Sequence, residues 1–500
     1  IIGPCRFITA CRDEAIIGEN GDDDGPAKVY VVHRTNLNPY YYEIDVEDQP
    51  NFFSRPAVAP AGDVDNDGTT DFIVGGHVTR VYSGRTGAVV ASFIGENPGD
   101  QFGQAVAGIG DIDGNGFDDI AVGAPLNTAG TGDFSGLFPQ AGRVYVFLTR
   151  PLGQFGHRPA AAADIIFTGN AGDWVGFDIA SGDVNGDDVP DLIMGAIYAR
   201  PANEQFPFGG KVYIYFACPD LATPVEFGAG DDPLDDDVNV IISQTVQNEF
   251  FGWSVAAGGD FDNDGRDDVA VGFYKGRDQG MDTGKTYIFS SADLWRGGPT
   301  CDPAPVFVDS ETAAVKLAGR QDAPISQGGG EGSISFGWDV AFVGDVNGNG
   351  HDDILIGAPY YDEGIDPDIP LLPLLVDSGE AYLFHGFAGT FTGTSEDADI
   401  TYAGTMEGAE LGYAVGGHGR ANLSAFPDLI IGAPGYDQGA GRAFVFFSCR
   451  DHASGQPCGR PLPEIRDGRG QGPLHGARAL AHRRQPVEGS RTMVRHGRKG

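Results

Sequence analysis

Short apolar runs recur along the chain in groups of three. In one group, residues 105–109, 120–122 and 144–147 follow one another, and comparable groups recur further along the sequence. The runs are only a few residues long, rich in β-branched side chains and bounded by glycine, so each is too short for a helix and is typical of a β-strand. A fourth, weaker run, such as 164–167, completes a four-stranded antiparallel meander. The pattern therefore predicts an all-β protein.

A nine-residue loop rich in aspartate separates the first and second runs of each group. Five copies start at Asp63, Asp111, Asp183, Asp260 and Asp345, and each has Asp or Asn at positions 1, 3, 5 and 9. Calcium takes six to eight oxygen ligands, so a loop that brings several such side chains to one point suits it. Ordinary turns also use Asp, Asn and Gly, but five copies with one spacing favour metal binding. We predict about five Ca²⁺ sites with these ligands: Asp63, Asp65, Asp67 and Asp71; Asp111, Asp113, Asn115 and Asp119; Asp183, Asn185, Asp187 and Asp191; Asp260, Asp262, Asp264 and Asp268; Asp345, Asn347, Asn349 and Asp353.

The loops differ in ways that bear on affinity. The ninth-position Asp leads directly into a strand, unlike the twelfth-position Glu of an EF-hand, which precedes a helix, so we interpret each loop as part of a β-hairpin. All four ligand positions are carboxylates in the Asp63 and Asp260 loops, which we expect to bind calcium most tightly. A sixth copy at 417–428 has His418, Arg420 and Asn422 at the ligand positions. We predict that this copy binds no metal.

The spacing of the loops distinguishes between repeat architectures. Successive loop starts lie 48, 72, 77 and 85 residues apart, a spread that fits blades with loops of variable length but not a solenoid of fixed helices. Residues 14–18 and 28–32 look like two strands of a further unit whose beginning is incomplete. With the sixth copy, this makes seven units. We therefore predict a seven-bladed β-propeller of four-stranded antiparallel blades over residues 1–458, closed into a ring without an exposed edge.

Charge is unevenly distributed along the chain. The formal net charge is −39, which repels phosphate backbones and anionic lipid surfaces, so we expect no nucleic-acid partner. The last 41 residues, by contrast, hold ten Lys or Arg against three acids and show no apolar periodicity, and we interpret 459–500 as a basic, disordered tail. No apolar run approaches the ~20 residues of a membrane helix, and the longest, 369–376, is interrupted by two prolines. We predict no membrane span in this chain.

Six cysteines leave two interpretations open. They match no zinc-binding spacing. Short separations favour the disulfides Cys5–Cys11 and Cys449–Cys458, while reduced, buried thiols are the alternative.

Glycine-centred motifs bracket the loops. Phe102-Gly103 precedes one loop and Gly123-Ala124-Pro125 follows it, and later units repeat this bracket. Over roughly residues 14–448 the chain resembles the FG-GAP repeat of integrin alpha subunits and their bacterial relatives. Two units depart from the pattern: the unit at 175–197 has Val-Gly and Gly-Ala-Ile, and the unit around Asp63 lacks both signatures.

The resemblance implies both a fold and a function. It implies a seven-bladed propeller that is extracellular or on the cell surface, with calcium on one face and adhesion through loops on the other. An antiparallel meander independently puts the Asp-rich loops and the connections after the second strands at opposite edges. The long connections 126–140, 197–209, 274–283 and 360–378 are therefore the expected ligand surface.

Two functional hypotheses follow. The first is a non-enzymatic, calcium-binding recognition or cell-adhesion propeller that contacts an extracellular protein or glycan; docking of a second subunit, as on integrin alpha chains, stays open. The alternative is a propeller enzyme or accessory domain that acts on polysaccharide or phospholipid. Its acid and base would come from histidines that are scattered through the sequence: His77, His157, His351, His385 and His418. Because the sequence offers no catalytic constellation, we favour the first hypothesis.

Overall fold

The computed structural model describes most of the chain between residues 57 and 448, with short segments on either side. The described residues are 14–19, 27–35, 38–46, 57–128, 140–150, 156–200, 209–217, 224–228, 234–278, 281–295, 305–320, 335–362, 375–417, 419, 426–436, 441–446, 448 and 477–481. All six cysteines fall outside these ranges, so the two proposed disulfides stay predictions.

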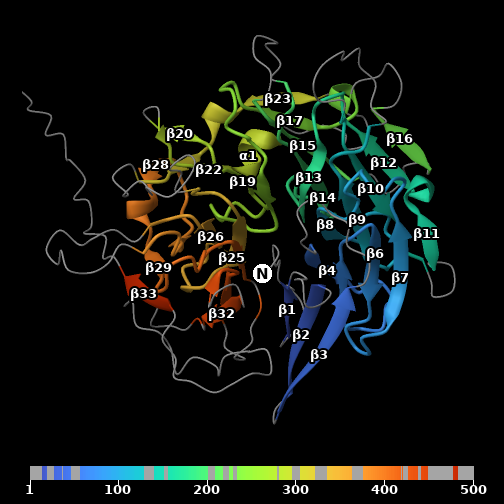
Figure 1. Ribbon diagram of the computed structural model, residues 1–500. Coiled ribbons are helices and arrows are strands. Elements are labelled where there is room, and N and C mark those ends of the chain that lie inside the picture. Colours follow the sequence, from blue (N-terminus) through green and yellow to red (C-terminus); the bar gives the residue numbers. More distant parts are fainter. Residues whose placement is uncertain are drawn as a thin grey trace, which may run out of the picture.

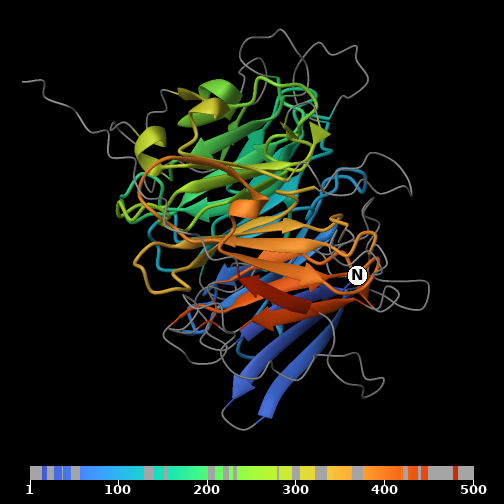
Figure 2. The same cartoon turned by 90° about the vertical axis from the view of Figure 1, so that its left-hand side faces the viewer.

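Small antiparallel sheets surround a common centre (Figure 1), which confirms the all-β propeller predicted from the strand pattern. We call a sheet a blade when its two innermost strands flank an Asp-rich loop or the sixth copy of that loop. The innermost strands of successive blades contact one another around the centre. The perpendicular view shows the strands of the C-terminal half of the chain, coloured yellow to red, one above another (Figure 2).

The antiparallel core of each blade follows chain order from the centre outwards, as a meander does. The strand bounds are β4 (Val58–Gly62), β5 (Asp71–Val74), β6 (Val78–Tyr82) and β7 (Val89–Ile94) in blade 1; β8 (Val106–Gly110), β9 (Asp119–Ala124), β10 (Arg143–Phe147) and β12 (Ile165–Thr168) in blade 2; β13 (Val175–Gly182), β14 (Asp191–Ala196), β15 (Lys211–Tyr215) and β17 (Val240–Ser243) in blade 3; β18 (Ser254–Ala256), β19 (Val269–Phe273), β22 (Lys285–Phe289) and β24 (Val315–Ala318) in blade 4; β25 (Val340–Gly344), β26 (Asp353–Ala358), β27 (Glu380–Phe384) and β29 (Ile400–Gly404) in blade 5; and β30 (Ala414–Gly416), β31 (Leu429–Ala433) and β32 (Arg442–Phe446) in blade 6.

A fifth strand extends blades 1 to 5 beyond the four strands expected from the sequence. In blades 1 to 4 this strand comes from the next repeat and runs parallel to the fourth strand, so it ties neighbouring blades together: β11 (His157–Pro159) pairs with β7, β16 (Val225–Phe227) with β12, β23 (Val306–Asp309) with β17, and β28 (Phe391–Thr394) with β24. Each then leads through a 3₁₀ turn, η1 (Ala160–Ala162), η2 (Leu234–Asp236), η3 (Ser310–Thr312) or η4 (Ser395–Asp397), towards the fourth strand of its own blade. In blade 5 the fifth strand is β33 (Ala477–Ala481), which pairs antiparallel with β29 and lies within the segment expected to be a disordered tail.

The described part of the chain has six blades, so the prediction of seven is wrong. The N-terminal segment forms a separate three-stranded antiparallel sheet of β1 (Glu14–Glu19), β2 (Ala27–Thr35) and β3 (Asn38–Val46). This sheet lies next to blade 1, and β1 contacts β4 (Figure 1). Within the described ranges this sheet has no inner hairpin with an Asp-rich loop. The short apolar runs at 14–18 and 28–32, which led to the prediction of a seventh unit, carry no information about such a hairpin.

The hydrophobic core lies between the blades, where the face of one sheet packs on the next. Between blades 1 and 2, for example, Ile73 and Phe93 meet Val122 and Phe147, and all four are buried. The rings of Phe93 and Phe147 lie 4.0 Å apart between centroids. Because neighbouring sheets share their core in this way, the stability of each blade depends on its packing against the next.

A close glycine contact between neighbouring blades explains the spacing of the glycine motifs. A Cβ atom on Gly123 of β9 would lie 2.2 Å from the carbonyl oxygen of Gly176, which follows Val175 in the next blade. Blade 1 has the same contact, between Gly75 and Gly103, although its sequence lacks the Gly-Ala-Pro signature. Only glycine permits such an approach of two backbones. The contact recurs at three more boundaries, in the pairs Gly195 and Gly252, Gly272 and Gly337, and Gly357 and Gly412.

Helices contribute little to the described part of the chain. The α-helix there, α1 (Ser291–Leu294), is a single turn that follows β22. No helix in the described ranges is long and apolar enough to cross a membrane.

Candidate metal centre

The five Asp-rich loops lie on one edge of the ring, which we call the Asp rim. Each joins the first and second strands of its blade, and we number the loops as their blades: loop 1 (63–71), loop 2 (111–119), loop 3 (183–191), loop 4 (260–268) and loop 5 (345–353). The connections after the second strands, and those before the first strands, lie on the other edge, the opposite rim. The sequence-based assignment of the loops to hairpins is therefore confirmed by the strand order.

The carboxylate at position 1 organises each loop from within. In loop 4, Asp260 Oδ1 accepts the N–H of Asp264 at 2.9 Å and Oδ2 accepts the N–H of Gly265 at 2.9 Å. Gly265 has φ of 92°, a conformation that glycine adopts without steric cost. Asp188 occupies the same position in loop 3 with φ of 65°. Position-1 carboxylates in the other loops accept the corresponding N–H groups at 2.7 to 3.0 Å.

The carboxylate at position 9 is fully buried and holds the loop to the rest of its blade. In loop 2, Asp119 Oδ2 accepts the N–H of Ile112 at 3.0 Å, and its Oδ1 accepts the N–H of Thr149, just beyond β10, at 2.7 Å. The other four loops repeat both bonds. Position 9 therefore has a structural role in the fold besides any role in binding a metal.

Positions 1, 3 and 9 converge in three of the loops. One carboxylate oxygen from each of these positions lies within 4.8 Å of the other two in each triplet: Asp63, Asp65 and Asp71; Asp111, Asp113 and Asp119; Asp260, Asp262 and Asp268. Such a spacing brings hard oxygen donors around one point, as a calcium ion requires. Loops 3 and 5 have Asn185 and Asn347 at position 3, and each donates its Nδ2 to the position-9 carboxylate at 3.3 Å.

Unpaired oxygens at position 3 fit a bound cation. Oδ1 of Asp65, of Asp262 and of Asn185 is buried, and among the residues that the structure describes none of these atoms has a hydrogen-bond partner. A buried oxygen without a donor is costly unless a ligand meets it. The chemistry of these donors, carboxylate and amide oxygen, matches calcium rather than a soft metal.

Electrostatics at the Asp rim also favour a cation. Burial, and then the neighbouring carboxylates, raise the pKa of Asp71 to about 7 and that of Asp119 and Asp268 to about 8. Burial also raises the pKa of Asp191 and Asp353 to about 8. A raised carboxyl pKa means that negative charge is unfavourable there without a compensating positive charge. A divalent cation would supply that charge.

Position 5, a predicted ligand, does not belong to the convergent clusters. Asp67 forms an ion pair with Arg85 at 2.7 Å. Asn115 donates its Nδ2 to the carbonyl oxygen of Thr149 at 3.0 Å, and Asn349 donates to the carbonyl oxygen of Gly386 at 3.2 Å. Asp264 accepts from the hydroxyl of Ser291 at 3.0 Å, and Asp187 accepts the N–H of Val189 at 3.0 Å. Their assignment as ligands stays a prediction.

The sixth copy keeps the structural bond of position 9. His418, Arg420 and Asn422 lie outside the described residues, so the prediction that this copy binds no metal is untested. Asp428, its position 9, is buried and accepts the N–H of Ser448 at 2.9 Å. This bond is the same one that the other five loops make to the end of the third strand.

The opposite rim has a different character, because aromatic side chains line it. A pocket of about 330 Å³ opens there at the centre of the ring. Its lining includes Phe177, Trp253, Trp338 and Tyr413, at or just before the starts of inner strands, and Tyr360, which follows β26. The ring centroid of Trp338 lies 5.0 to 5.3 Å from those of Trp253, Tyr360 and Tyr413. Two carboxylates, Asp178 and Asp339, also line this pocket.

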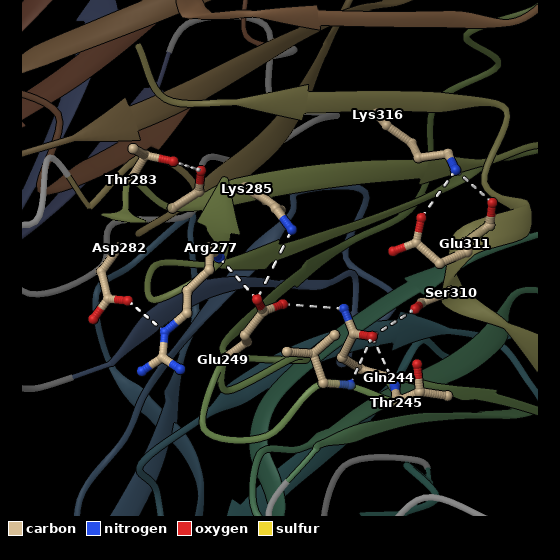
Figure 3. A network of polar contacts seen from close by, with 12 residues as sticks. Gln244, Thr245, Glu249, Arg277, Asp282, Thr283, Lys285, Ser310, Glu311 and Lys316 are labelled. Atoms are coloured by element: carbon tan, nitrogen blue, oxygen red, sulfur yellow. Dashed lines mark hydrogen bonds and ion pairs between the residues drawn. The ribbon is translucent and has the colours of Figure 1, made fainter. Parts of the chain in front are cut away.

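One of the predicted ligand connections, 274–283, is anchored to the segment that joins blades 3 and 4. It forms a small hairpin of β20 (Arg277–Asp278) and β21 (Met281–Asp282). Figure 3 shows the buried carboxylate of Glu249, which accepts the main-chain N–H of Arg277 at 2.9 Å and the Nε2 of Gln244 at 3.2 Å. Lys285 Nζ lies 3.9 Å from Glu249. Most of each of the other three connections lies outside the described residues, which end at 128, 200 and 362 on their N-terminal sides.

The histidines considered for catalysis do not form one site in the described ranges. His157 Nδ1 contacts the hydroxyl of Ser92 at the outer edge of blade 1. His351 Nδ1 lies 3.2 Å from the carbonyl oxygen of Phe261, and His385 lies 3.6 Å from Asp399. His77 is in the turn between β5 and β6, at the opposite rim, and His418 is not described.

Comparison with known families agrees with this geometry. The FG-GAP repeat matches residues 102–147, 175–215, 251–289 and 336–384, each stretch running to the end of the third strand of blades 2 to 5. The chain is an integrin alpha-like FG-GAP β-propeller. Blade 1 precedes the matched stretches, yet its loop and its close glycine contact are those of an FG-GAP unit.

Integrin alpha subunits are among the proteins that this FG-GAP propeller resembles. It is 26% identical to Integrin alpha pat-2 of Caenorhabditis elegans over 267 residues, which covers 52% of this chain and 18% of the relative. It is 31% identical to Integrin alpha-PS2 of Drosophila melanogaster over 210 residues (40% and 12%), and 24% identical to Integrin alpha-8 of Gallus gallus over 283 residues (55% and 21%). The match thus spans about a fifth or less of each relative's length.

Proposed function

We propose that this chain is a calcium-stabilised recognition propeller of the cell-adhesion type, at the cell surface or outside the cell. In this proposal calcium at the Asp rim is structural, and the opposite rim contacts an extracellular protein or glycan. The chain itself is not an enzyme. Resemblance to integrin alpha subunits supports the adhesion role.

The observation that carries the proposal is the convergence of positions 1, 3 and 9 around buried, unpaired oxygens. Asp260, Asp262 and Asp268 bring one oxygen each within 4.8 Å of the others, and Oδ1 of Asp262 lacks a hydrogen-bond donor among the described residues. Carboxylates at position 1 and position 9 are meanwhile fixed by main-chain N–H groups. Ligands that are already held in place lose little freedom when an ion binds.

Calcium would stabilise the fold chiefly by binding the native state. At a calcium concentration about ten times the dissociation constant, one site contributes roughly 1.4 kcal/mol. Five such sites would contribute about 7 kcal/mol, comparable with the whole stability of a typical domain. We therefore assign these ions to holding the blades rather than to catalysis.

The opposite rim suits recognition because it combines aromatic and acidic side chains in one pocket. Half-buried Trp253 and Trp338 can offer large contact areas at low entropic cost, and Asp178 and Asp339 can accept hydrogen bonds. Connections of variable length lie on the same rim as this pocket. Docking of a second subunit on this rim belongs to the same proposal.

Two experiments test the two halves of the proposal separately. Scanning calorimetry in calcium and in chelator should show a lower melting temperature in chelator, and a superimposable pair of curves would contradict structural calcium. Arrays of glycans and extracellular-matrix proteins, probed in calcium buffer with the chain and with Trp338→Ala as the matched control, should show ligands that the variant loses. Equal binding by both proteins would place recognition elsewhere.

A further inference from the structure

Neighbouring Asp-rich loops are joined across the blade boundary by the residue at position 8. In loop 2 this residue is Asp118, and its Oδ2 accepts the N–H of Asp63, position 1 of loop 1, at 2.6 Å. The N–H of Asp118 points back to the carbonyl oxygen of Asp63 at 3.4 Å. Loop 2 thus holds both main-chain polar groups of the residue that carries the first ligand of loop 1.

The same reciprocal pair recurs at two more boundaries. Asp267 of loop 4 accepts the N–H of Asp183 at 2.8 Å and donates its own N–H to the carbonyl oxygen of Asp183 at 3.0 Å. Asp352 of loop 5 accepts the N–H of Asp260 at 3.1 Å and donates to its carbonyl oxygen at 3.0 Å. We call each reciprocal pair a latch.

The boundary between loops 2 and 3 has no latch, since position 8 of loop 3 is Pro190. Proline has neither an N–H nor a carboxylate to offer. Its ring lies against Gly110, where a Cβ atom would come within 2.7 Å of Pro190 Cγ. Position 8 of the sixth copy is Pro427. The latches therefore divide the loops into two sets, loops 1 and 2, and loops 3, 4 and 5.

We propose that the position-8 aspartates Asp118, Asp267 and Asp352 are positioning residues that couple calcium binding between neighbouring loops. This inference rests on the proposed function, because it assumes that the loops bind calcium. Each position-8 residue directly precedes the buried position-9 ligand of its own loop, so an ion in that loop fixes both residues. The latch then fixes position 1 of the preceding loop, whose carboxylate organises that loop's ligands.

The coupling arises because each latch restricts the conformations of the neighbouring loop. A loop whose first ligand is already held by its neighbour loses less conformational freedom when its own ion binds, so the second ion binds more tightly than the first. By thermodynamic linkage the effect is reciprocal between the two loops. Filling should be cooperative within each set of loops and independent across the Pro190 boundary.

The glycines at position 6 give a readout for four of the five loops. The N–H groups of Gly68, Gly116, Gly265 and Gly350 donate to the position-1 carboxylates of loops 1, 2, 4 and 5 at 2.7 to 2.9 Å. In the full chain labelled with ¹⁵N-glycine, each of these amide signals should shift as Ca²⁺ fills its own loop. A calcium titration then yields one affinity for each of these four loops, independently of thermal stability.

The first test removes one latch. Asp352→Ala should weaken calcium binding reported by Gly265, in the neighbouring blade, by about three- to tenfold, since it deletes a partly buried hydrogen bond. Asp352→Asn keeps an acceptor oxygen and should bind nearly as the parent does, which separates the hydrogen bond from simple loss of charge. Pro190→Ala is the matched control at the boundary without a latch and should leave the affinity reported by Gly116 unchanged.

The second test breaks an ion site instead of a latch. Asp345→Ala in loop 5 should weaken calcium binding reported by Gly265, whereas Asp183→Ala in loop 3 should leave the affinity reported by Gly116 unaltered. This pair of variants tests the coupling between loops even where Asp352→Ala fails to fold. If Gly265 titrates identically in the parent and in both Asp352→Ala and Asp345→Ala, the coupling is overturned while calcium binding stands. If no position-6 glycine of the parent responds to calcium, the proposed function itself fails.

Discussion

The two rims of the propeller differ in how far their structure repeats from blade to blade. The Asp rim repeats one nine-residue loop five times, with the same main-chain bonds to positions 1 and 9 in each copy. On the opposite rim, connections vary in length and an aromatic pocket replaces the repeated bonds. Repetition of this kind indicates a role shared by every blade, which is stability, while variation indicates a role particular to this protein, which is recognition.

The strongest way to break this comparison is to remove a position-9 carboxylate. Asp268→Ala should lower the free energy of unfolding by about 2 to 5 kcal/mol even in chelator, because the buried N–H groups of Phe261 and Ser291 lose their acceptor. Chemical denaturation without calcium measures the loss due to the hydrogen bonds, and denaturation with calcium adds the loss of stabilisation by the ion. Asp428→Ala should destabilise the sixth copy to a similar extent, but with no change in the dependence on calcium. A calcium-dependent loss in Asp428→Ala would contradict the distinction between the loops.

The next largest effect is expected at the opposite rim. Trp338→Ala should reduce affinity for any ligand of the pocket by tenfold or more, because Trp338 packs against three other aromatic rings at its edge. It should leave the number of bound calcium ions unchanged. Phe307→Ala, on the outer strand β23 and 56% exposed, is the control and should alter neither property. Loss of calcium in Trp338→Ala would show that the two rims are not separate in function.

A smaller difference should appear in the pH dependence of stability at the opposite rim. Burial raises the pKa of Asp173 from 3.8 to about 6, and Lys211 offsets part of that rise. The native state therefore binds the proton more tightly than the unfolded chain does, so this group's contribution to stability falls as the pH rises from about 4 to 6. Asp173→Asn should remove about 2 kcal/mol of that fall, measured by denaturation at pH 4 and pH 6.5. An unchanged slope would show that Asp173 does not titrate in this window.

The smallest expected effect returns to the Asp rim. Arg85 is an exposed residue that pairs with Asp67, position 5 of loop 1. Arg85→Ala should release Asp67 towards the cluster and tighten calcium binding in loop 1 by about twofold, a magnitude typical of exposed ion pairs. A calcium titration followed by the amide signal of Gly68 measures this change in affinity. Weaker binding in the variant would mean that Asp67 is no ligand.

Much of the fold could be predicted from the sequence because strands, loops and glycine motifs leave local patterns. Apolar runs around the five loops identified the inner strands, and the loop spacing identified the hairpins. Positions 1, 3 and 9 were predicted and converge in three loops. Position 5 was predicted on the same spacing, but its side chains reach partners such as Arg85 and Thr149 that are distant in sequence.

The remaining features depend on contacts between blades, which leave no local pattern. The fifth strands β11 and β16 have three residues each and pair parallel with another repeat, so no alternation identifies them. The number of blades was overestimated because β1 and β2 resemble blade strands although no Asp-rich loop precedes them. The latch of Asp118 was missed since an Asp at position 8 is indistinguishable from a turn residue until its partner in the preceding loop is known.

The central claim is that the Asp rim holds several calcium ions, and calcium stoichiometry tests it most directly. Isothermal titration of the chelator-treated full chain with Ca²⁺ should show about five ions bound per chain, with position-1 substitutions such as Asp260→Ala each removing one. A chain that binds no calcium at millimolar concentration, or keeps its full stoichiometry when position 1 is replaced, would contradict the account.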